Sequence, residues 1–569
     1  MDKGEGANLG EANQLFGGLV IQALRLLGVE HYVVSPGSRS TPLSLGVAAL
    51  GKESSTVCID ERSAAFHALG RIKATRQPVA LICTSGTAGA HYLPAVIEAR
   101  ESSLPLLILT ADRPPELHHC HAGQTVEQHS LYGHYPVFQG ELPLPEMSHI
   151  LMRQVRELCR RAVENMMGWP MGPVHLNCPF REPFFTESGE SCASTEIEKV
   201  LEGLVPVEPA ISLSGGEICL PSRTLILAGP RPWKDPEGEI SEILSLSAKQ
   251  GWPILADGVS PLRYGKKGEA SLVTRYDQIV RDDAAWESLK PDGVLLWGEP
   301  PTSKILRERL SSLDVPGIQI GTGKMGMNPF HGKIQWMGGS VNGLTFPDVS
   351  KDSAYSDQWG AAEENANARL DTAFQSLHPL FEGDVHRFLC KVLQKGSQVF
   401  YTSSLAVRDV EWFAPSRTES LSPFSQRGAN GIDGTVSLAR GIARGSGKPV
   451  YLVSGDLAFL HDSNGLLGSR GQEPGVFVVL INNSGGGIFE LLPVARKTEH
   501  FESVFATPQD VDFGKLVEAH GGRHSLCATL DDLEFEMSEW DGKGICVAEV
   551  PIDRKVSADL HRQFLKGMD

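Results

Sequence analysis

The stretch that decides the fold runs from "VYLVSGDLAF" (450–459) to "VFVVLINNSGGG" (476–487). Both segments begin as apolar runs rich in β-branched residues, which predicts two strands, and the interval between them has room for a crossover helix. Asp456 directly follows the first strand and Asn483 follows the second. If the two strands are parallel neighbours, their carboxyl ends meet at one edge of the sheet, where ligands bind in open α/β folds.

The residues at these strand ends suit a hard cation. Mg²⁺ typically binds a few protein oxygen atoms and completes its coordination with waters and phosphates. The carboxylate of Asp456 and the amide oxygen of Asn483 are ligands of this kind. Three glycines, 485–487, would let the backbone approach a ligand closely. The alternative is structural, with Asp456 as a helix N-cap and Asn483 in a turn. Spacing alone leaves both open, and for Asn482 we expect only a role in holding the turn.

Strands alternate with helical patterns along the whole chain, which at 569 residues is too long for a single core. We predict an α/β fold of three domains, each a mostly parallel sheet flanked by helices. The expected domains are residues 1–185, 205–350 and 378–569. Two polar stretches, 186–199 and 347–367, are interpreted as the segments that separate them. The first and last domains have similar patterns, which indicates a pair of related architectures.

Composition excludes several classes of protein. A net charge of -17 argues against binding to nucleic acid or anionic membranes. The apolar runs are far shorter than the roughly 18 residues of a membrane span, and the polar N-terminus has no secretory signal pattern. Ten cysteines without a CxxC pair are expected to be reduced, in the cytoplasm. The segment "HHCHAG" (118–123) offers metal ligands, but ligands on one short loop rarely close a tetrahedral site, so a polar loop is favoured.

The segment "GDL" (455–457) followed by "NN" (482–483) is similar to the diphosphate-binding motif of thiamine-diphosphate enzymes. The resemblance implies thiamine diphosphate as cofactor. It also implies that Asp456, Asn483 and the backbone carbonyl of Gly485 hold Mg²⁺, which Mn²⁺ can replace, against the diphosphate.

A glutamate that binds the pyrimidine N1′ is the second component of such enzymes, because it promotes deprotonation of the thiazolium C2. Glu61 follows an apolar run and opens a helical stretch in "CIDERSAAF" (58–66). By position alone, a first-turn glutamate favoured by the helix dipole is the preferred explanation. Together with the diphosphate motif, the resemblance assigns the N1′ role to Glu61.

The resemblance narrows to one family when seven motifs are taken in order: "SPGSRSTPL", "DERSAAF", "TSGTA", "LTADRPPEL", "RGANGIDG", "GDL" and "NNSGGGIFELLP". Together they resemble the 2-succinyl-5-enolpyruvyl-6-hydroxy-3-cyclohexene-1-carboxylate synthases of menaquinone biosynthesis (the MenD family). The implied activity is that of a transferase. It decarboxylates 2-oxoglutarate and adds the resulting succinyl-semialdehyde carbanion in 1,4-fashion to isochorismate.

Both implied substrates are multiply anionic, and arginine forks bind carboxylates in bidentate fashion. The residues that the resemblance places against substrate are Ser38, Arg39, Arg113, Gln124, Lys304, Ser404, Arg408, Arg427 and Leu492. Those implied to act in catalysis are Glu61, Arg39, Gln124 and Arg408. Those implied to line the cofactor are Glu61, Ile432, Gly455, Asp456, Leu457, Asn483, Gly485, Ile488 and Phe489, with Ile432 supporting its bent conformation.

Three positions depart from the family pattern. Leu457 stands where the motif usually has glycine, Gly123 where an asparagine is frequent, and Ile305 where a second cation usually follows Lys304. The resemblance also implies a homodimer or a dimer of dimers. The alternatives are another thiamine-diphosphate enzyme acting on 2-oxo acids, either a decarboxylase or an acetolactate-type synthase, and a non-catalytic cofactor-binding protein.

Overall fold

The computed structural model describes residues 3–186, 194–209, 216–230, 236–265, 268–321, 328–338, 340–347, 353–468 and 474–565. The chain forms two compact units, which are described separately. The first unit comprises residues 1–211 with 440–446, and the second comprises 212–439 with 447–569.

The first unit is built on a six-stranded parallel sheet with the strand order β2-β1-β3-β4-β6-β5. Its strands are β1 (His31–Val34), β2 (Ser55–Val57), β3 (Val79–Cys83), β4 (Leu106–Asp112), β5 (Phe138–Glu141) and β6 (Val174–Pro179). The central strands are continuous apolar runs, and every residue of β3 and β4 is buried. Such runs are typical of parallel strands that are covered on both faces.

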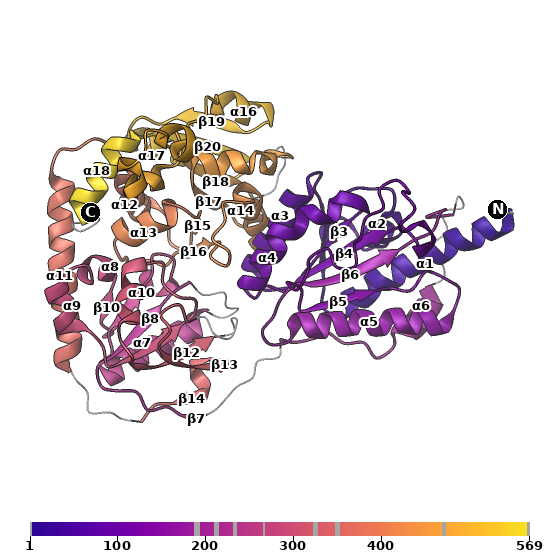
Figure 1. Ribbon diagram of the computed structural model, residues 1–569, viewed down its shortest axis with the longest axis horizontal. Coiled ribbons are helices and arrows are strands. Elements are labelled where there is room, and N and C mark those ends of the chain that lie inside the picture. The colour runs from indigo at the N-terminus through magenta and orange to yellow at the C-terminus, as the bar shows by residue number, and fades with distance from the viewer. Residues whose placement is uncertain are drawn as a thin grey trace. The chain divides into compact units, whose positions relative to one another are not determined.

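Helices cover both faces of this sheet (Figure 1). Leu19 of α1, Val155 of α5 and Ile82 of β3 belong to one core on one face, and α3 and α4 cover the other. The helices of this unit are α1 (Lys3–Leu26), α2 (Thr41–Ala48), α3 (Glu61–Thr75), α4 (Leu93–Glu101), α5 (His149–Met167) and α6 (Ser194–Leu201).

The second unit contains two further six-stranded parallel sheets. The central one has the order β10-β9-β8-β11-β12-β13, which is the doubly wound arrangement in which strand order reverses at the first strand. Its strands are β8 (Thr224–Ala228), β9 (Ile254–Ala256), β10 (Leu272–Val273), β11 (Gly293–Trp297), β12 (Pro316–Gly321) and β13 (Lys333–Gly338). A short parallel pair, β7 (Gly216–Glu217) and β14 (Leu344–Thr345), forms a separate two-stranded sheet. The helices of this part are α7 (Pro236–Gln250), α8 (Tyr276–Ile279), α9 (Asp283–Leu289), α10 (Lys304–Ser311) and α11 (Ser353–Gln375).

The C-terminal sheet has the order β16-β15-β17-β18-β20-β19. Its strands are β15 (Gln398–Tyr401), β16 (Ser422–Ser425), β17 (Val450–Gly455), β18 (Val476–Asn482), β19 (Arg523–Leu526) and β20 (Ile545–Pro551). Its helices are α12 (Glu382–Val392), α13 (Ala406–Phe413), α14 (Thr435–Ser446), α15 (Asp456–His461), α16 (Phe513–Ala519), α17 (Leu530–Glu539) and α18 (Arg554–Leu565). If the six strands of each sheet are numbered along the chain, this sheet and the first one have the same spatial order, 2-1-3-4-6-5. The predicted pairing of related architectures is therefore confirmed.

The three predicted parallel sheets are therefore present, but the two polar stretches are not simple connectors. Residues 353–367 of the second stretch belong to α11, whose Tyr355 and Trp359 are buried in the core of the central sheet. In the first stretch, residues 187–193 lie outside the described part, and α6 follows. Ile197 and Leu201 of α6 pack into the core of the first unit. A few apolar residues at helical spacing are enough to anchor an otherwise polar helix.

The described residues also bear on two expectations from the sequence, one about membrane-spanning segments and one about the cysteines. No helix among them is long and apolar enough to cross a membrane. The nine cysteines in the described ranges are all free thiols, and six of them are buried.

Candidate active site

The carboxyl ends of β17 and β18 form the centre of the site. The two strands pair in parallel along their length, with Gly455 opposite Ile481. The predicted adjacency of the strand ends is thus confirmed, and Asp456 and Asn483 leave the sheet at the same edge. This juxtaposition follows from the parallel pairing of β17 and β18, because both strands then end at the same edge of the sheet.

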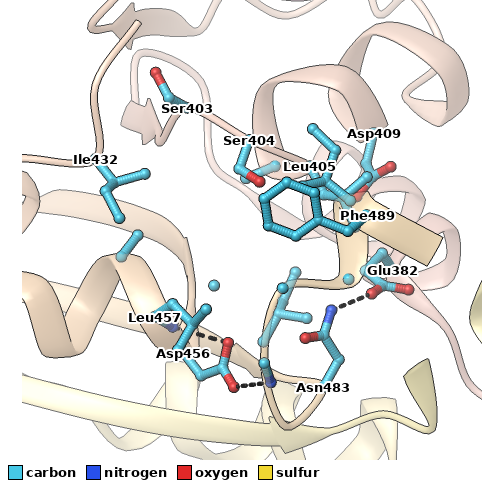
Figure 2. Close-up of a pocket in the computed structure, with 18 residues that line it drawn as sticks. Glu382, Ser403, Ser404, Leu405, Asp409, Ile432, Asp456, Leu457, Asn483 and Phe489 are labelled. Carbon is cyan, nitrogen blue, oxygen red and sulfur yellow. Dashed lines mark hydrogen bonds between the residues drawn. The ribbon is translucent and has the colours of Figure 1, made fainter. Parts of the chain in front are cut away.

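A cavity of about 180 Å³ opens between these strand ends (Figure 2). Nine of the predicted cofactor, metal and substrate residues line it: Ser404, Ile432, Gly455, Asp456, Leu457, Asn483, Gly485, Ile488 and Phe489. The cavity combines apolar side chains with the Asp456 carboxylate and the Asn483 carboxamide at its floor. Binding sites for small molecules typically have this composition.

Asp456 is held rigidly at the floor of the cavity. Its Oδ1 accepts from the backbone N–H of Leu457 at 2.8 Å, and its Oδ2 accepts from the N–H of Gly485 at 2.6 Å. Burial raises the pKa of Asp456 to about 6, and the two backbone N–H groups oppose this rise. Asp456 is the first residue of α15 and Gly455 is its N-cap, so the N-cap alternative for Asp456 does not describe the structure.

Asn483 is buried beside Asp456, and its two amide atoms have different environments. Its Nδ2 donates to Oε1 of Glu382 at 3.0 Å, whereas its Oδ1 has no hydrogen-bond partner in the described part of the chain. A buried acceptor without a partner is costly unless a ligand satisfies it. Together with the Asp456 carboxylate and nearby backbone carbonyls, this oxygen fits the all-oxygen coordination that Mg²⁺ prefers.

The glycines after β18 are required by close packing. Gly485 has a φ of +127°, and a Cβ there would lie 2.1 Å from the carbonyl oxygen of Ala506. A Cβ on Gly487 would lie 2.5 Å from Nδ2 of Asn483. By contrast, Asn482 accepts from the N–H of Ser484 at 3.1 Å, which is the turn-holding role expected for it.

No three His, Cys, Asp or Glu side chains come together as a metal-binding group anywhere in the described ranges. This includes the loop His118–His121. The strand-end site is built differently, because it offers one carboxylate, one amide oxygen and backbone.

A second and larger cavity, of about 710 Å³, adjoins the first at Ile488. Among its lining residues are the predicted substrate residues Lys304, Arg408 and Leu492. Lys304 is exposed at the start of α10 and lies 3.3 Å from Glu308. Leu492 is exposed, with Leu491 beside it in the wall.

Arg408 on α13 is one of several cationic side chains that line this cavity. Burial lowers the pKa of Arg408 to about 10, and the neighbouring charges of Arg427 and Arg307 contribute to the decrease. A guanidinium with this pKa remains charged at neutral pH. For Arg408 and Arg307, no carboxylate lies within ion-pair distance among the residues that the structure describes. Clustered cations of this kind attract a multiply charged anion.

Glu61 lies in the first unit, at the first position of α3. The N-cap of this helix is Asp60, whose carboxylate accepts from the N–H of Ser63 at 2.9 Å. Asp60 therefore caps the helix, and Glu61 is the acidic residue of its first turn, where the helix dipole favours it. The half-buried Glu61 carboxylate receives no hydrogen bond within the described ranges, so it is available to an external donor.

The remaining predicted residues of the first unit gather where β1, β3 and β4 end. Arg113 donates to the hydroxyl of Ser85, and Gln124 Nε2 lies 3.5 Å from the Ser85 carbonyl. Arg39 is buried and donates to Phe180 O at 2.8 Å and to Glu182 Oε1 at 3.0 Å. Burial and the nearby Arg113 charge lower the pKa of Arg39. Ser38 is exposed on the loop after β1.

Many residues that line the cavities were not predicted, and Glu382 and Arg307 are the two on which the proposals below depend. Glu382 comes from the start of α12, where an acidic residue looks like an ordinary partner of the helix dipole. Arg307 lies three residues after Lys304 on α10, hence on the same face of the helix. That spacing could have identified Arg307, because it provides a cation near the position where Ile305 lacks one. No local signal identifies Glu382.

Comparison with known proteins agrees with this geometry. Residues 16–131 match the family described as "Thiamine pyrophosphate enzyme, N-terminal TPP binding domain". Residues 414–549 match "Thiamine pyrophosphate enzyme, C-terminal TPP binding domain". The second match contains Asp456 and Asn483, and the first contains Glu61.

Two solved structures share the fold. One is a putative thiamin diphosphate-dependent enzyme from Mycobacterium smegmatis, with a TM-score of 0.64 and 16% identity, covering 94% of this chain and 99% of that one. The other is benzoylformate decarboxylase from Polynucleobacter necessarius, with a TM-score of 0.61 and 15% identity, covering 95% and 98%. At such identities the likeness shows the fold alone.

Sequence relatives are much closer. A 2-succinyl-5-enolpyruvyl-6-hydroxy-3-cyclohexene-1-carboxylate synthase from Synechococcus sp. (strain JA-3-3Ab) is 38% identical, over 97% of this chain and 96% of its own length. The enzyme of the same name from Microcystis aeruginosa is 40% identical, over 95% and 96%. With identity of this level over nearly the full length, and with both thiamine pyrophosphate domains present, the chain belongs to the family of 2-succinyl-5-enolpyruvyl-6-hydroxy-3-cyclohexene-1-carboxylate synthases.

Proposed function

We propose that this chain decarboxylates 2-oxoglutarate and adds the remaining four-carbon unit to isochorismate, giving 2-succinyl-5-enolpyruvyl-6-hydroxy-3-cyclohexene-1-carboxylate for menaquinone biosynthesis. The observation that carries the proposal is the adjacency of two cavities that share Ile488. One has the oxygen ligands for a metal-bound diphosphate, and the other has the cations for multiply anionic substrates.

Asp456, Asn483 and the carbonyl of Gly485 would hold Mg²⁺, and Gly455 and Leu457 would lie along the diphosphate. Ile432 and Phe489 provide apolar surface for the body of the cofactor, since both line the same cavity. When bound, thiamine diphosphate supplies the electron sink needed for loss of CO₂ from a 2-oxo acid.

Glu61 would accept a hydrogen bond from the pyrimidine N1′ and hold a proton there. Its carboxylate has no competing hydrogen bond in the described structure, and Asp60 caps the helix in its place. We also propose that the glutamate and the diphosphate ligands of one site come from two chains. We therefore propose a homodimer or a dimer of dimers, in which the partner provides the second half of each site.

The cationic side chains would bind and orient the substrate carboxylates. Arg408 is central, because it lies in the larger cavity with no carboxylate partner in the described ranges. Holding two reactants in a fixed orientation accounts for a large part of the rate in such reactions. The residues proposed to share this task are Ser38, Arg39, Arg113, Gln124, Lys304, Ser404, Arg427 and Leu492.

We further propose the domain bounds 1–185, 205–350 and 378–569 and a cytoplasmic location. A thiamine-diphosphate decarboxylase or acetolactate-type synthase is the second candidate. It is disfavoured because a small, singly charged donor such as pyruvate does not need the cationic cavity around Arg408 and Arg307.

The test is reconstitution of the apo-protein with thiamine diphosphate and Mg²⁺, followed by measurement of isochorismate absorbance. The absorbance should fall only when 2-oxoglutarate is present, with release of CO₂. If isochorismate disappears regardless of 2-oxoglutarate, or if pyruvate is consumed in its place, the proposed function is wrong.

A further inference from the structure

Asn483 is anchored on one side and open on the other. Its Nδ2 donates to Glu382 Oε1 at 3.0 Å, and its Oδ1 is buried without a partner in the described chain. Figure 2 shows the amide nitrogen directed at Glu382 and the amide oxygen on the opposite side, toward Asp456. The side chain is thus oriented with its acceptor facing the cavity.

A carboxamide has two nearly isosteric ends, so something must select which end faces the cavity. An ionised carboxylate only accepts hydrogen bonds, and it therefore pairs with the NH₂ end and repels the oxygen end. Glu382 is 1% exposed and provides such an acceptor. If the amide were turned over, two NH₂ protons would face the proposed cation site.

The other oxygen of Glu382 is also occupied. The hydroxyl of Ser557, on α18, donates to Oε2 of Glu382. Both carboxylate oxygens of Glu382 therefore accept hydrogen bonds from neutral donors, and the carboxylate is fixed in position from two sides. Asn483, Glu382 and Ser557 are all buried, which strengthens these hydrogen bonds relative to exposed ones.

The ion pair of His561 and Asp409 stabilises the position of Ser557. His561, one turn after Ser557, has Nδ1 at 2.8 Å from the Ser557 carbonyl and Nε2 at 2.9 Å from Oδ1 of Asp409. Because both ring nitrogens face acceptors, both must donate, and the ring is an imidazolium. The pair of His561 and Asp409 fixes α18 against α13, which holds Ser557 in place.

We propose that Glu382 is a positioning residue for the metal site: it fixes the carboxamide of Asn483 with Oδ1 toward the cation, and Ser557 fixes Glu382. This inference rests on the proposed function, since it takes Asn483 as a ligand of Mg²⁺. Residues that hydrogen-bond to a metal ligand commonly have this role, because they restrict the ligand to its binding orientation.

The test compares Glu382→Gln and Ser557→Ala with the unchanged protein. The Glu382→Gln side chain keeps the volume but offers one acceptor and one donor, so it no longer selects the amide orientation. We expect the Mg²⁺ concentration for half-maximal binding, followed by tryptophan fluorescence with thiamine diphosphate present, to rise about 10- to 100-fold in Glu382→Gln. A smaller rise is expected in Ser557→Ala. Saturating Mg²⁺ should restore most of kcat, as a positioning role requires.

The chain offers a matched control one residue away. Asn482 Nδ2 donates to Glu549 Oε1 at 2.7 Å, which is the same pairing outside the cavity lining. Glu549→Gln should leave the Mg²⁺ dependence unchanged. The inference is overturned if Glu382→Gln binds Mg²⁺ as the unchanged protein does, or if Glu549→Gln weakens binding equally.

Circular dichroism detects misfolding of Glu382→Gln. If that variant misfolds, the Mg²⁺ titration of Ser557→Ala tests whether Glu382 positions Asn483. A loss of kcat that saturating Mg²⁺ does not restore would also contradict the positioning role. Failure of the proposed function looks different, because the unchanged protein would then bind Mg²⁺ and thiamine diphosphate, with the same effect of Glu382→Gln on that binding, and yet would not consume isochorismate in the presence of 2-oxoglutarate.

Discussion

The backbone N–H of Gly485 donates to Oδ2 of Asp456 at 2.6 Å, across the carboxyl ends of two neighbouring strands. This hydrogen bond joins the loop after β18 to the first turn of α15. It fixes the geometry of both proposed metal ligands before any ligand binds. The positions of the Asp456 carboxylate and the Gly485 carbonyl are therefore coupled, and a change in either residue should disturb the same site.

Replacing Gly485 with alanine should disrupt this loop. A Cβ at this position would lie 2.1 Å from the Ala506 carbonyl oxygen, and the φ of +127° is unfavourable for any side chain. Backbone strain of this kind costs about 1–3 kcal/mol. We expect a lower midpoint of thermal denaturation and loss of the stabilisation that Mg²⁺ with thiamine diphosphate gives the unchanged protein. Equal stabilisation by the cofactor in both proteins would contradict this.

Replacing Asp456 with asparagine should abolish Mg²⁺ binding while preserving the fold. Asparagine has nearly the same size, but its charge is lost, and an NH₂ group would face either the N–H of Leu457 or that of Gly485. Losing a residue that only supports a ligand costs about 10- to 100-fold in affinity, so we expect the loss here to exceed roughly 100-fold. Titration of Mg²⁺ in the presence of thiamine diphosphate measures it, with circular dichroism as the control.

Glu61→Gln should reduce kcat by about 100-fold or more, the usual range for a residue that handles a proton in the reaction. The thermal midpoint should barely change, because Asp60 rather than Glu61 caps α3. The matched control is Asp60→Ala, which should lower stability by about 1 kcal/mol through loss of the cap. A Glu61→Gln protein with full turnover would remove Glu61 from the mechanism.

Arg408→Gln should weaken substrate binding more than it alters the fold. Arg408 faces the larger cavity without a carboxylate partner in the described part of the chain, so no buried anion is left unpaired when its charge is removed. A hydrogen bond to a charged group contributes about 1.5–3 kcal/mol, which corresponds to a rise in KM of roughly 10- to 100-fold. Arg408→Lys should recover part of the lost substrate binding, because it restores the charge but not the two parallel N–H donors of the guanidinium. An unchanged KM for both substrates would exclude Arg408 from their binding.

The stability of the protein should decrease between pH 7 and pH 9. Burial opposes protonation of His561, but Asp409 prevails and raises its pKa to about 9 from the ordinary 6.5. The stabilisation is complete below pH 6.5 and is lost as the pH rises through 9, at up to about 1.4 kcal/mol per pH unit. Burial raises the pKa of Asp409 to about 6, so Asp409 is ionised across this window in either state.

His561→Gln provides the comparison for that prediction. The variant should be less stable than the unchanged protein at pH 7, and the difference between their thermal midpoints should shrink as the pH rises past the folded pKa of about 9. A difference that stays constant over this range would show that His561 is neutral in the folded protein.

Local patterns predicted the two strand ends at the centre of the site. An apolar run that ends in Asp456 or Asn483 identifies a strand and its exit from neighbouring residues alone, and parallel topology then brings the exits together. The same reasoning failed for residues 353–367, because the buried face of α11 there consists of Tyr355, Trp359 and Ala366 among many polar residues.

The sequence by itself determined which residues stand at the strand ends and which chemistry they can perform, because strand periodicity and turn residues act over a few positions. Only the tertiary structure decided which way the Asn483 amide faces. That depends on Glu382, 101 positions away, and on Ser557, 175 positions from Glu382. Hydrogen bonds over such separations leave no periodic signal in the chain, because packing of α12 and α18 against the sheet creates them.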